Sequence, residues 1–123
     1  MTLAPQVKVL AKVLVVEDEP LIRMATIAFV EEIGLQALGA GDGEQALSIL
    51  RNDPDIGVLL ADLGLPGMTG HQLIEQAVRL KPDLKIVVIT GRSAEQAAGQ
   101  KPAHAAYLSK PFTLAQLRRV LKV

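Results

Sequence analysis

Ile56-Gly57-Val58-Leu59-Leu60-Ala61-Asp62 is the stretch that decides the fold. It is the most continuous apolar run in the chain, it has the length of a strand, and it stops at a carboxylate. Short apolar runs of this kind are typical of strands that are buried on both faces of a parallel sheet. We therefore predict a central strand over residues 56–61, with Asp62 at its carboxyl end.

Three further apolar runs stop at polar residues of other kinds. They are Val13–Val16, which leads into Glu17 and Asp18; Ile86–Ile89, which leads into Thr90; and Ala105–Leu108, which leads through Ser109 into Lys110. If the runs are parallel strands, these polar residues meet at the edge where open α/β sheets bind their ligands. The sequence therefore predicts a site that combines carboxylates, a hydroxyl group and an ammonium group.

Segments with helical periodicity alternate with these strands. The predicted helices cover residues 20–33, 42–51, 71–80 and 114–121, with one or two weak turns over 93–100, and a short strand is predicted over 35–39. Asp42 with Gln45, and Thr113 with Gln116, have the spacing of capping boxes. This alternation indicates an α/β fold, a doubly wound five-stranded parallel sheet with helices on both faces.

Length, charge and composition narrow the class of protein. A chain of 123 residues fits one domain, which we place at residues 12–123 after an N-terminal leader, residues 1–11. Thirteen basic residues balance thirteen acidic ones, so direct nucleic-acid binding is not expected. The absence of cysteine excludes thiol catalysis, and the apolar runs are too short to span a membrane. We expect a cytoplasmic monomer or weak dimer.

Glu17, Asp18 and Asp62 would bring three carboxylates into one shallow site. Two like charges about 4 Å apart repel by roughly 4 kcal/mol at an effective dielectric of 20, so this site favours a cation. Oxygen ligands suit Mg²⁺, with Mn²⁺ as the alternative. A carboxylate beside Mg²⁺ can attack phosphorus, while the Lys110 ammonium and the Thr90 hydroxyl stabilise the transferred group.

The motifs that hold these residues resemble the receiver domain of bacterial two-component response regulators, of the chemotaxis-regulator-like single-domain type. The four matching motifs are VVEDEP (15–20), DLGLPGMTG (62–70), ITG (89–91) and YLSKPF (107–112). Their order along the chain, each at a strand end, makes the resemblance specific. It implies a flavodoxin-like receiver fold and a signalling module that is not an enzyme toward a separate substrate.

The resemblance also implies a chemistry for this site. Asp62 would take a phosphoryl group from a phosphohistidine of a sensor histidine kinase or a histidine phosphotransfer protein. Asp18, Asp62 and the backbone carbonyl of Gly64 would hold Mg²⁺, with Glu17 acting through water. An unknown downstream protein would then recognise the phosphorylated form.

Further residues take expected roles from the same resemblance. Thr90 and Lys110 would contact the phosphate, and Thr90 would move together with Tyr107 as a switch. The peptide bond between Lys110 and Pro111 is expected to be cis. Arg92 would influence the lifetime of the phosphorylated form.

Two departures from the family pattern leave alternatives open. Glu17 stands where Asp is commonest, and residues 93–104 would make a poor fourth helix, which keeps a phosphorylation-independent docking module possible. A Mg²⁺-dependent phosphohydrolase usually has an acid two residues after the nucleophile, where this chain has Gly64. A flavin binder would stack its ring on aromatic side chains, and this chain has one Tyr and two Phe.

Overall fold

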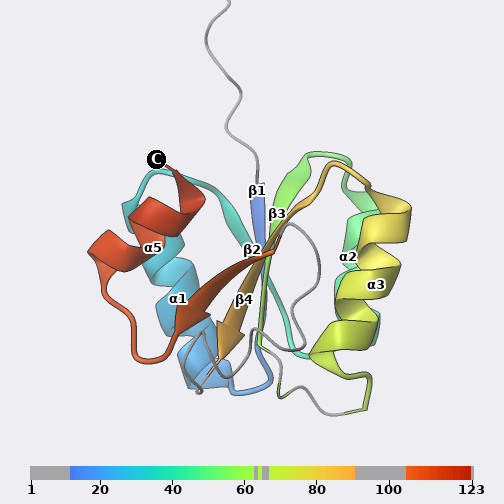
Figure 1. The fold of residues 1–123 in the computed structure, drawn as a ribbon, viewed down its shortest axis with the longest axis horizontal. Coiled ribbons are helices and arrows are strands. Elements are labelled where there is room, and N and C mark those ends of the chain that lie inside the picture. The colour runs from blue at the N-terminus through green and yellow to red at the C-terminus, as the bar shows by residue number, and fades with distance from the viewer. Residues whose placement is uncertain (1–11, 63, 65–66, 91–104, 123) are drawn as a thin grey trace, which may run out of the picture.

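The five strands form one parallel sheet, and helices cover both of its faces (Figure 1). The computed structural model describes residues 12–62, 64, 67–90 and 105–122. The elements in chain order are β1 (Lys12–Val16), α1 (Pro20–Glu32), β2 (Ala37–Ala40), α2 (Gly43–Asn52), β3 (Ile56–Asp62), α3 (Gly70–Leu80), β4 (Lys85–Thr90), β5 (Ala106–Ser109) and α5 (Leu114–Leu121). The predicted leader, residues 1–11, and the weak turns predicted over 93–100 lie outside the described residues.

The strand order is β2-β1-β3-β4-β5, and every neighbouring pair is parallel. This arrangement confirms the predicted α/β fold with its doubly wound, five-stranded sheet. The chain turns to opposite sides of β1 for β2 and for β3, so the winding reverses at β1. Ligands of such sheets bind in the crevice at the carboxyl ends of the strands beside this reversal.

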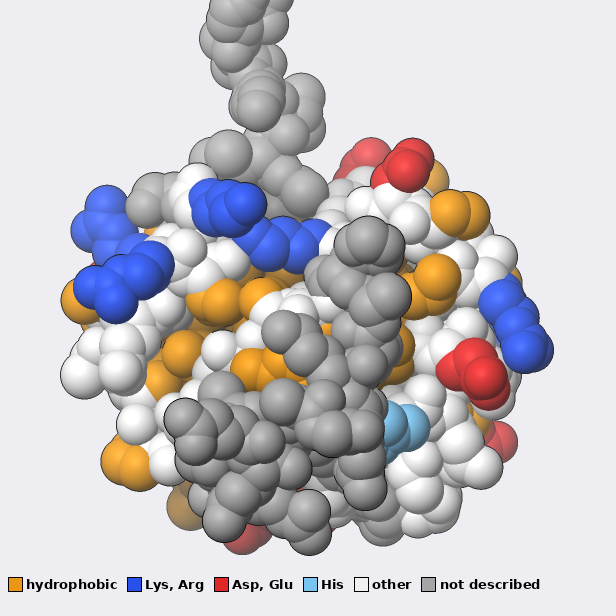
Figure 2. All heavy atoms as spheres, viewed as in Figure 1, with side chains coloured by type: hydrophobic (Ala, Val, Ile, Leu, Met, Phe, Trp, Pro, Cys, Tyr) orange, Lys and Arg blue, Asp and Glu red, His pale blue; other side chains and the backbone are white. Residues whose placement is uncertain are grey.

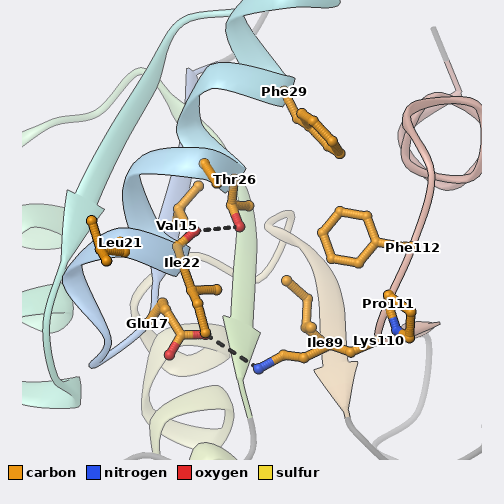
Figure 3. Close-up of a pocket in the computed structure, with 11 residues that line it drawn as sticks. Val15, Glu17, Leu21, Ile22, Thr26, Phe29, Ile89, Lys110, Pro111 and Phe112 are labelled. Carbon is orange, nitrogen blue, oxygen red and sulfur yellow. Dashed lines mark hydrogen bonds and ion pairs between the residues drawn. The ribbon is translucent and has the colours of Figure 1, made fainter.

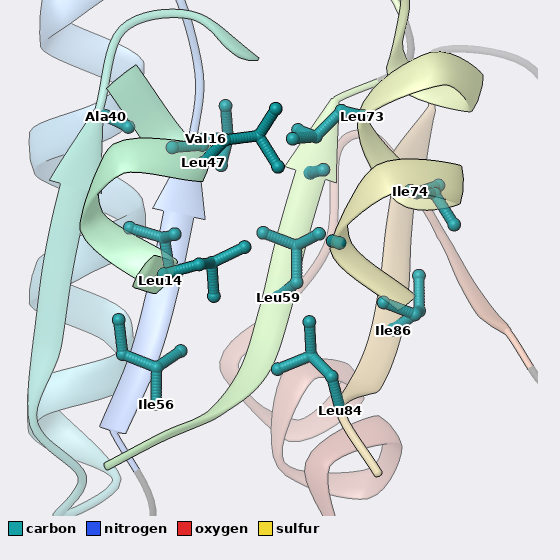
Figure 4. Packing of buried hydrophobic residues seen from close by; sticks show 14 of the residues in the cluster. Leu14, Val16, Ala40, Leu47, Ile56, Leu59, Leu73, Ile74, Leu84 and Ile86 are labelled. Carbon is teal, nitrogen blue, oxygen red and sulfur yellow. The ribbon is translucent and has the colours of Figure 1, made fainter. Parts of the chain in front are cut away.

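Side chains alternate along each strand and form two apolar clusters, one on each face of the sheet. Leu14 and Leu59 belong to the cluster under α2 and α3, which we call the closed face (Figure 4). Val15 and Leu60 belong to the cluster under α1 and α5, which we call the open face. Figure 1 shows α1 and α5 together on one side of the sheet, and α2 and α3 on the other.

Polar caps fix where the helices begin. The capping box predicted for Thr113 and Gln116 is present at α5, and a second one, which the sequence reading had not identified, opens α3. At α2, Asp42 accepts a hydrogen bond from the Gln45 backbone N–H at 2.8 Å as expected. The reciprocal half of that box is wrong, because the Gln45 side chain accepts from the Gly41 N–H at 2.6 Å instead.

Two strands are displaced from their predicted positions. β2 begins at Ala37 rather than Leu35, because the Leu35 N–H donates to the Val30 carbonyl and closes the turn after α1. Gly34 sits in that turn at φ +103°, a left-handed conformation that favours glycine. β5 begins at Ala106, one residue later than predicted.

Candidate functional site

Three side chains from three strands meet at the carboxyl edge of the sheet. Glu17 follows β1, Asp62 ends β3 and Lys110 follows β5. The Lys110 Nζ donates to Asp62 Oδ2 at 2.6 Å and to Glu17 Oε1 at 3.3 Å. One ammonium group from an edge strand therefore pairs with carboxylates on the two strands that flank the winding reversal.

Backbone N–H groups orient both carboxylates. The second oxygen of Asp62 accepts from the Gly64 N–H at 2.9 Å, and the second oxygen of Glu17 accepts from the Glu19 N–H at 3.1 Å. The Asp62 side chain is 15% exposed and that of Glu17 only 5%. Each carboxylate is thus held at both of its oxygens and is largely removed from water.

The segment that carries Lys110 is fixed to the neighbouring strand. The Lys110 backbone N–H donates to the Thr90 carbonyl at 2.8 Å, directly at the end of β4. The peptide bond between Lys110 and Pro111 is cis, which confirms the expectation from the sequence. The lysine side chain therefore leaves the sheet at the level of the carboxylates.

Burial and charge shift the pKa values of the three groups in different directions. Burial raises the pKa of Glu17 above its ordinary 4.5, and the neighbouring Asp62 adds to the shift. Burial acts the same way on Asp62, but the hydrogen bonds from Lys110 and Gly64 outweigh it and hold the pKa of Asp62 below 3.8. Burial opposes the charge of Lys110, yet the contact with Asp62 raises the pKa of Lys110 above 10.5. The two carboxylates are therefore shifted in opposite directions, Glu17 toward the protonated form and Asp62 toward the ionised form.

The predicted metal ligands are only partly gathered. Within the described residues, no three Asp, Glu, His or Cys side chains come close enough to hold a metal ion. Glu17 and Asp62 share Lys110, whereas Asp18 is exposed. The donor chemistry nevertheless fits Mg²⁺, since the carboxylates already hold one cation and every predicted donor is an oxygen.

Comparison with known proteins decides the family. The family described as response regulator receiver domain matches residues 13–122. The chain belongs to this family. The response regulator receiver protein CpdR from Brucella abortus is 33% identical over 108 residues, which are 86% of this chain and 89% of that protein. Receiver domains are signalling modules rather than enzymes that act on a separate substrate.

Two further proteins share this similarity, one much longer than the chain and one of similar length. The sensor kinase CckA from Brucella abortus is 31% identical over 115 residues, which are 91% of this chain but only 12% of the kinase. The response regulator protein TrrA from Thermotoga maritima, solved in complex with Mg²⁺-BeF, has a TM-score of 0.82 and 27% identity over 92% of this chain and 97% of that one. The chain spans only a small part of the kinase.

The structure describes three of the four remaining predicted residues, Thr90, Tyr107 and Gly64. Thr90 ends β4 and is 4% exposed. Tyr107 lies on β5, where it packs against the closed face, and burial raises the pKa of its hydroxyl group above 10. Gly64 is exposed, and Arg92 falls outside the described residues.

A cavity of about 580 Å³ adjoins the receiver site on the open face. Its apolar walls come from the first turns of α1 and from Pro111 and Phe112, and Figure 3 shows Glu17 and Lys110 at one end of it. Phe29 and Phe112 meet edge to face, with ring centroids 6.1 Å apart. This cavity could not be predicted from the sequence, because it depends on how far α1 lies from the segment after β5.

Arg23 is a second feature that the sequence reading missed. Its Nη1 donates to the backbone carbonyl of Glu17 at 2.8 Å. The residue lies six positions after Glu17, on α1, and no spacing rule links a helical arginine to a strand-end carbonyl. The direction in which the chain turns from β1 into α1 brings them together.

Basic side chains gather near α5. Arg118 and Arg119 of α5, and Lys122 directly after it, are exposed, and Figure 2 shows Lys and Arg side chains at the upper left of the molecule, with acidic side chains at the upper right. The predicted solvated face of α5 is therefore present. None of the described helices is long and apolar enough to cross a bilayer.

Proposed function

We propose that this receiver domain accepts a phosphoryl group on Asp62 from the phosphohistidine of a sensor histidine kinase or a histidine phosphotransfer protein. The observation that carries the proposal is the setting of the Asp62 carboxylate at the carboxyl edge of the sheet, with Lys110 Nζ 2.6 Å from one oxygen and the Gly64 N–H 2.9 Å from the other. An ionised carboxylate at the edge of the crevice is the form that can act as a nucleophile.

The transfer of the phosphoryl group would be a displacement at phosphorus. An Asp62 oxygen forms the new P–O bond, the P–N bond of the phosphohistidine breaks, and the released imidazole nitrogen takes a proton from solvent. The Lys110 ammonium is already in contact with Asp62 and would move onto the oxygens of the transferred group. The Thr90 hydroxyl would be the second hydrogen-bond donor, so the two side chains would together stabilise the negative charge of the transferred phosphoryl group.

Mg²⁺ is the proposed cofactor of this reaction, with Mn²⁺ as a possible substitute. Asp18, Asp62 and the Gly64 carbonyl would hold it, and Glu17 would act through water. When bound, the ion would neutralise charge on the phosphoryl oxygens. The likeness to TrrA, whose solved complex contains Mg²⁺-BeF, supports this assignment.

The product would act by changing the affinity of one face for a downstream protein. A phosphoryl group adds about −1.5 to −2 charges, which biases an equilibrium between two packings of the surrounding segments. We assign the switch to Thr90 and Tyr107, because Thr90 ends β4, the strand beside Asp62, and Tyr107 lies on β5, the next strand along, paired with Val88 of β4. The reaction would take place in the cytoplasm, where sensor kinases present their phosphohistidine.

The experiment that tests the proposal is intact mass spectrometry after incubation with a small phosphodonor, acetyl phosphate, with Mg²⁺ or with EDTA. The wild type should gain one phosphoryl group only with Mg²⁺, and Asp62→Asn should gain none. Asp83→Asn is the matched control, because Asp83 is exposed in the turn before β4 and should be phosphorylated like the wild type.

Two outcomes would contradict the proposal. An adduct that persists in Asp62→Asn would place the phosphoryl group on another residue. No adduct from acetyl phosphate and none from a histidine kinase, in a protein that is folded by circular dichroism, would favour a phosphorylation-independent docking module.

A further inference from the structure

Arg23 is the one arginine of α1, and its side chain ends at the backbone of the predicted metal site. Its Nη1 donates to the Glu17 carbonyl at 2.8 Å, while its backbone N–H donates to the Glu19 carbonyl at 2.9 Å. Among the described residues the Arg23 side chain forms no ion pair. Although acidic residues lie nearby, the Arg23 guanidinium group therefore donates its hydrogen bond to a neutral peptide carbonyl.

Two glycines leave space for this side chain. A Cβ added to Gly39 would lie 2.9 Å from Ile27 Cδ1 and 3.1 Å from Arg23 Cδ, so this glycine leaves space for both side chains, and one added to Gly41 would lie 3.3 Å from Arg23 Nη1. Neither glycine has the positive φ that would require glycine for backbone reasons. These two glycines therefore matter because they have no side chain, and not because their backbone conformation requires glycine.

The hydrogen bond from Arg23 fixes the direction of the chain as it leaves β1. The Glu17 N–H donates to the Ala40 carbonyl at 3.0 Å, so the residue is already tied to β2 on its amino side. The Glu17 carbonyl lies in the same rigid plane as the Asp18 N–H, because the peptide bond is planar. The hydrogen bond to that carbonyl therefore fixes the orientation of the peptide plane that leads into Asp18.

We propose that Arg23 is a positioning residue for the Mg²⁺ site, which holds the peptide between Glu17 and Asp18 in the orientation that metal binding needs, and that Gly39 and Gly41 form the slot for its side chain. The proposal rests on the function proposed above, because it concerns the same Mg²⁺ site. It assigns Arg23 a role through the backbone and no contact with the metal.

Charge and position predict opposite effects for this residue. A positive guanidinium near a cation site repels the cation, so a purely electrostatic role means that removing the charge tightens Mg²⁺ binding. A positioning role means that removing the side chain weakens Mg²⁺ binding. The sign of the change therefore separates the two explanations.

The test is isothermal titration of MgCl₂ into the unphosphorylated protein. Loss of a group that orients metal ligands typically weakens metal affinity 10- to 100-fold, so Arg23→Gln should raise the Kd for Mg²⁺ by roughly tenfold. Arg23→Lys keeps one donor and should recover part of the affinity. Arg51→Gln removes an exposed arginine from the end of α2 and should leave the Kd within about twofold.

Gly41→Ala tests the slot while every charge stays in place. The added methyl group would meet the guanidinium first, and its next neighbour is Gln45 Oε1 at 3.6 Å. It should raise the Kd in the same direction as Arg23→Gln but by a smaller factor. In the double variant that combines Arg23→Gln with Gly41→Ala, the second change should cause no further loss of Mg²⁺ affinity, because both changes break the same interaction.

Urea unfolding in EDTA, measured on the same variants, separates binding from stability. A variant that is less stable but binds Mg²⁺ with the wild-type Kd would overturn the positioning role, and so would tighter binding by Arg23→Gln. If the wild type itself binds no Mg²⁺, the proposed function fails and the inference fails with it. If the wild type binds Mg²⁺ and the variants bind it with the same Kd, the inference about Arg23 fails while the proposed function stands.

Discussion

The two faces of the sheet are built from the same strands but are packed differently. On the closed face, α2 and α3 cover an apolar cluster. On the open face, α1 and α5 leave a cavity of about 580 Å³, which Glu17 and the buried Thr26 line, and the exposed Leu21 and Met24 lie on α1. One face is therefore filled to stabilise the fold, and the other leaves room and charge at the functional edge.

The largest expected difference is between two isoleucines of β4. Ile86 and Ile89 are each 4% exposed, but Ile86 packs in the closed face and Ile89 borders the cavity of the open face. Truncation of Ile86 to Ala should cost about 3 to 4 kcal/mol, and truncation of Ile89 about 2 kcal/mol, because cost grows with the new cavity that neighbours cannot refill.

Urea unfolding at 25 °C with EDTA measures both free energies of unfolding. The shared strand and the matched exposure make each variant the control for the other. Equal losses would mean that the open face is packed as tightly as the closed one.

Enlarging an alanine on each face reverses the experiment. Ala77 of α3 is fully buried in the closed face, so Ala77→Leu should overpack it and cost about 1 to 3 kcal/mol. Ala25 of α1 lines the cavity, so Ala25→Leu should be close to neutral because the new atoms have space. Thermal unfolding by circular dichroism would show the difference, and a comparable loss at Ala25 would contradict the description of the open face.

The buried carboxylate of the open face predicts a pH dependence that the closed face lacks. The raised pKa of Glu17 means that its favourable contribution is complete below pH 4.5 and is lost as the pH rises through the folded-state pKa. Asp62, whose pKa is lowered, contributes in the opposite sense, since its stabilisation is present above pH 3.8 and is lost as the pH falls through its folded-state pKa. Without metal at pH 7, Glu17→Gln should therefore gain about 1 kcal/mol, the lower end of the cost of burying a poorly compensated polar group.

Urea midpoints between pH 4 and pH 8, in EDTA, test this expectation. The wild type should lose stability above pH 4.5 relative to Glu17→Gln. Parallel pH profiles for the two proteins would show that Glu17 does not carry the effect.

The smallest effects are expected on the outer surfaces of the two layers. Leu21 on α1 is 79% exposed and Leu80 on α3 is 41% exposed. Leu21→Gln and Leu80→Gln should each change the free energy of unfolding by less than about 0.5 kcal/mol, because neither side chain contributes much to a core. Leu21 lines the cavity despite its exposure, so a loss above 1 kcal/mol there would mean that this lining contributes to the stability of the fold.

The strands could be predicted because their apolar runs are continuous and their ends are marked by polar residues. β1, β3 and β4 were predicted to within a residue of their observed bounds. The predicted start of β2 was wrong because Leu35 is an apolar residue that is buried in the turn after α1, where it is 8% exposed. In the sequence, an apolar residue that is buried in a turn cannot be told from the first residue of a strand. The start of α3 was missed by one residue because the Thr69 and Gln72 pair was not read as a capping box.

For the site, the sequence indicates which residue types gather but not how they pair. Parallel strands bring Glu17, Asp62 and Lys110 to one edge, and that follows from the pattern alone. Which carboxylate takes the shorter contact with the lysine, and in which direction the pKa of each is shifted, depends on burial and on the N–H groups of Gly64 and Glu19. The Arg23 contact and the cavity depend on helix placement, which periodicity does not determine.

The lysine that completes the site comes late in the chain. Lys110 follows Asp62 by 48 residues and Glu17 by 93. Ribosomes add about 5 to 20 residues per second, so Lys110 is made roughly 2 to 10 s after Asp62. A nascent chain can pair β1 with β3 in that interval, but its two carboxylates then face each other without the ammonium group. The acceptor site would be assembled only when β5 joins β4, so a partly synthesised chain would not yet be competent to receive a signal.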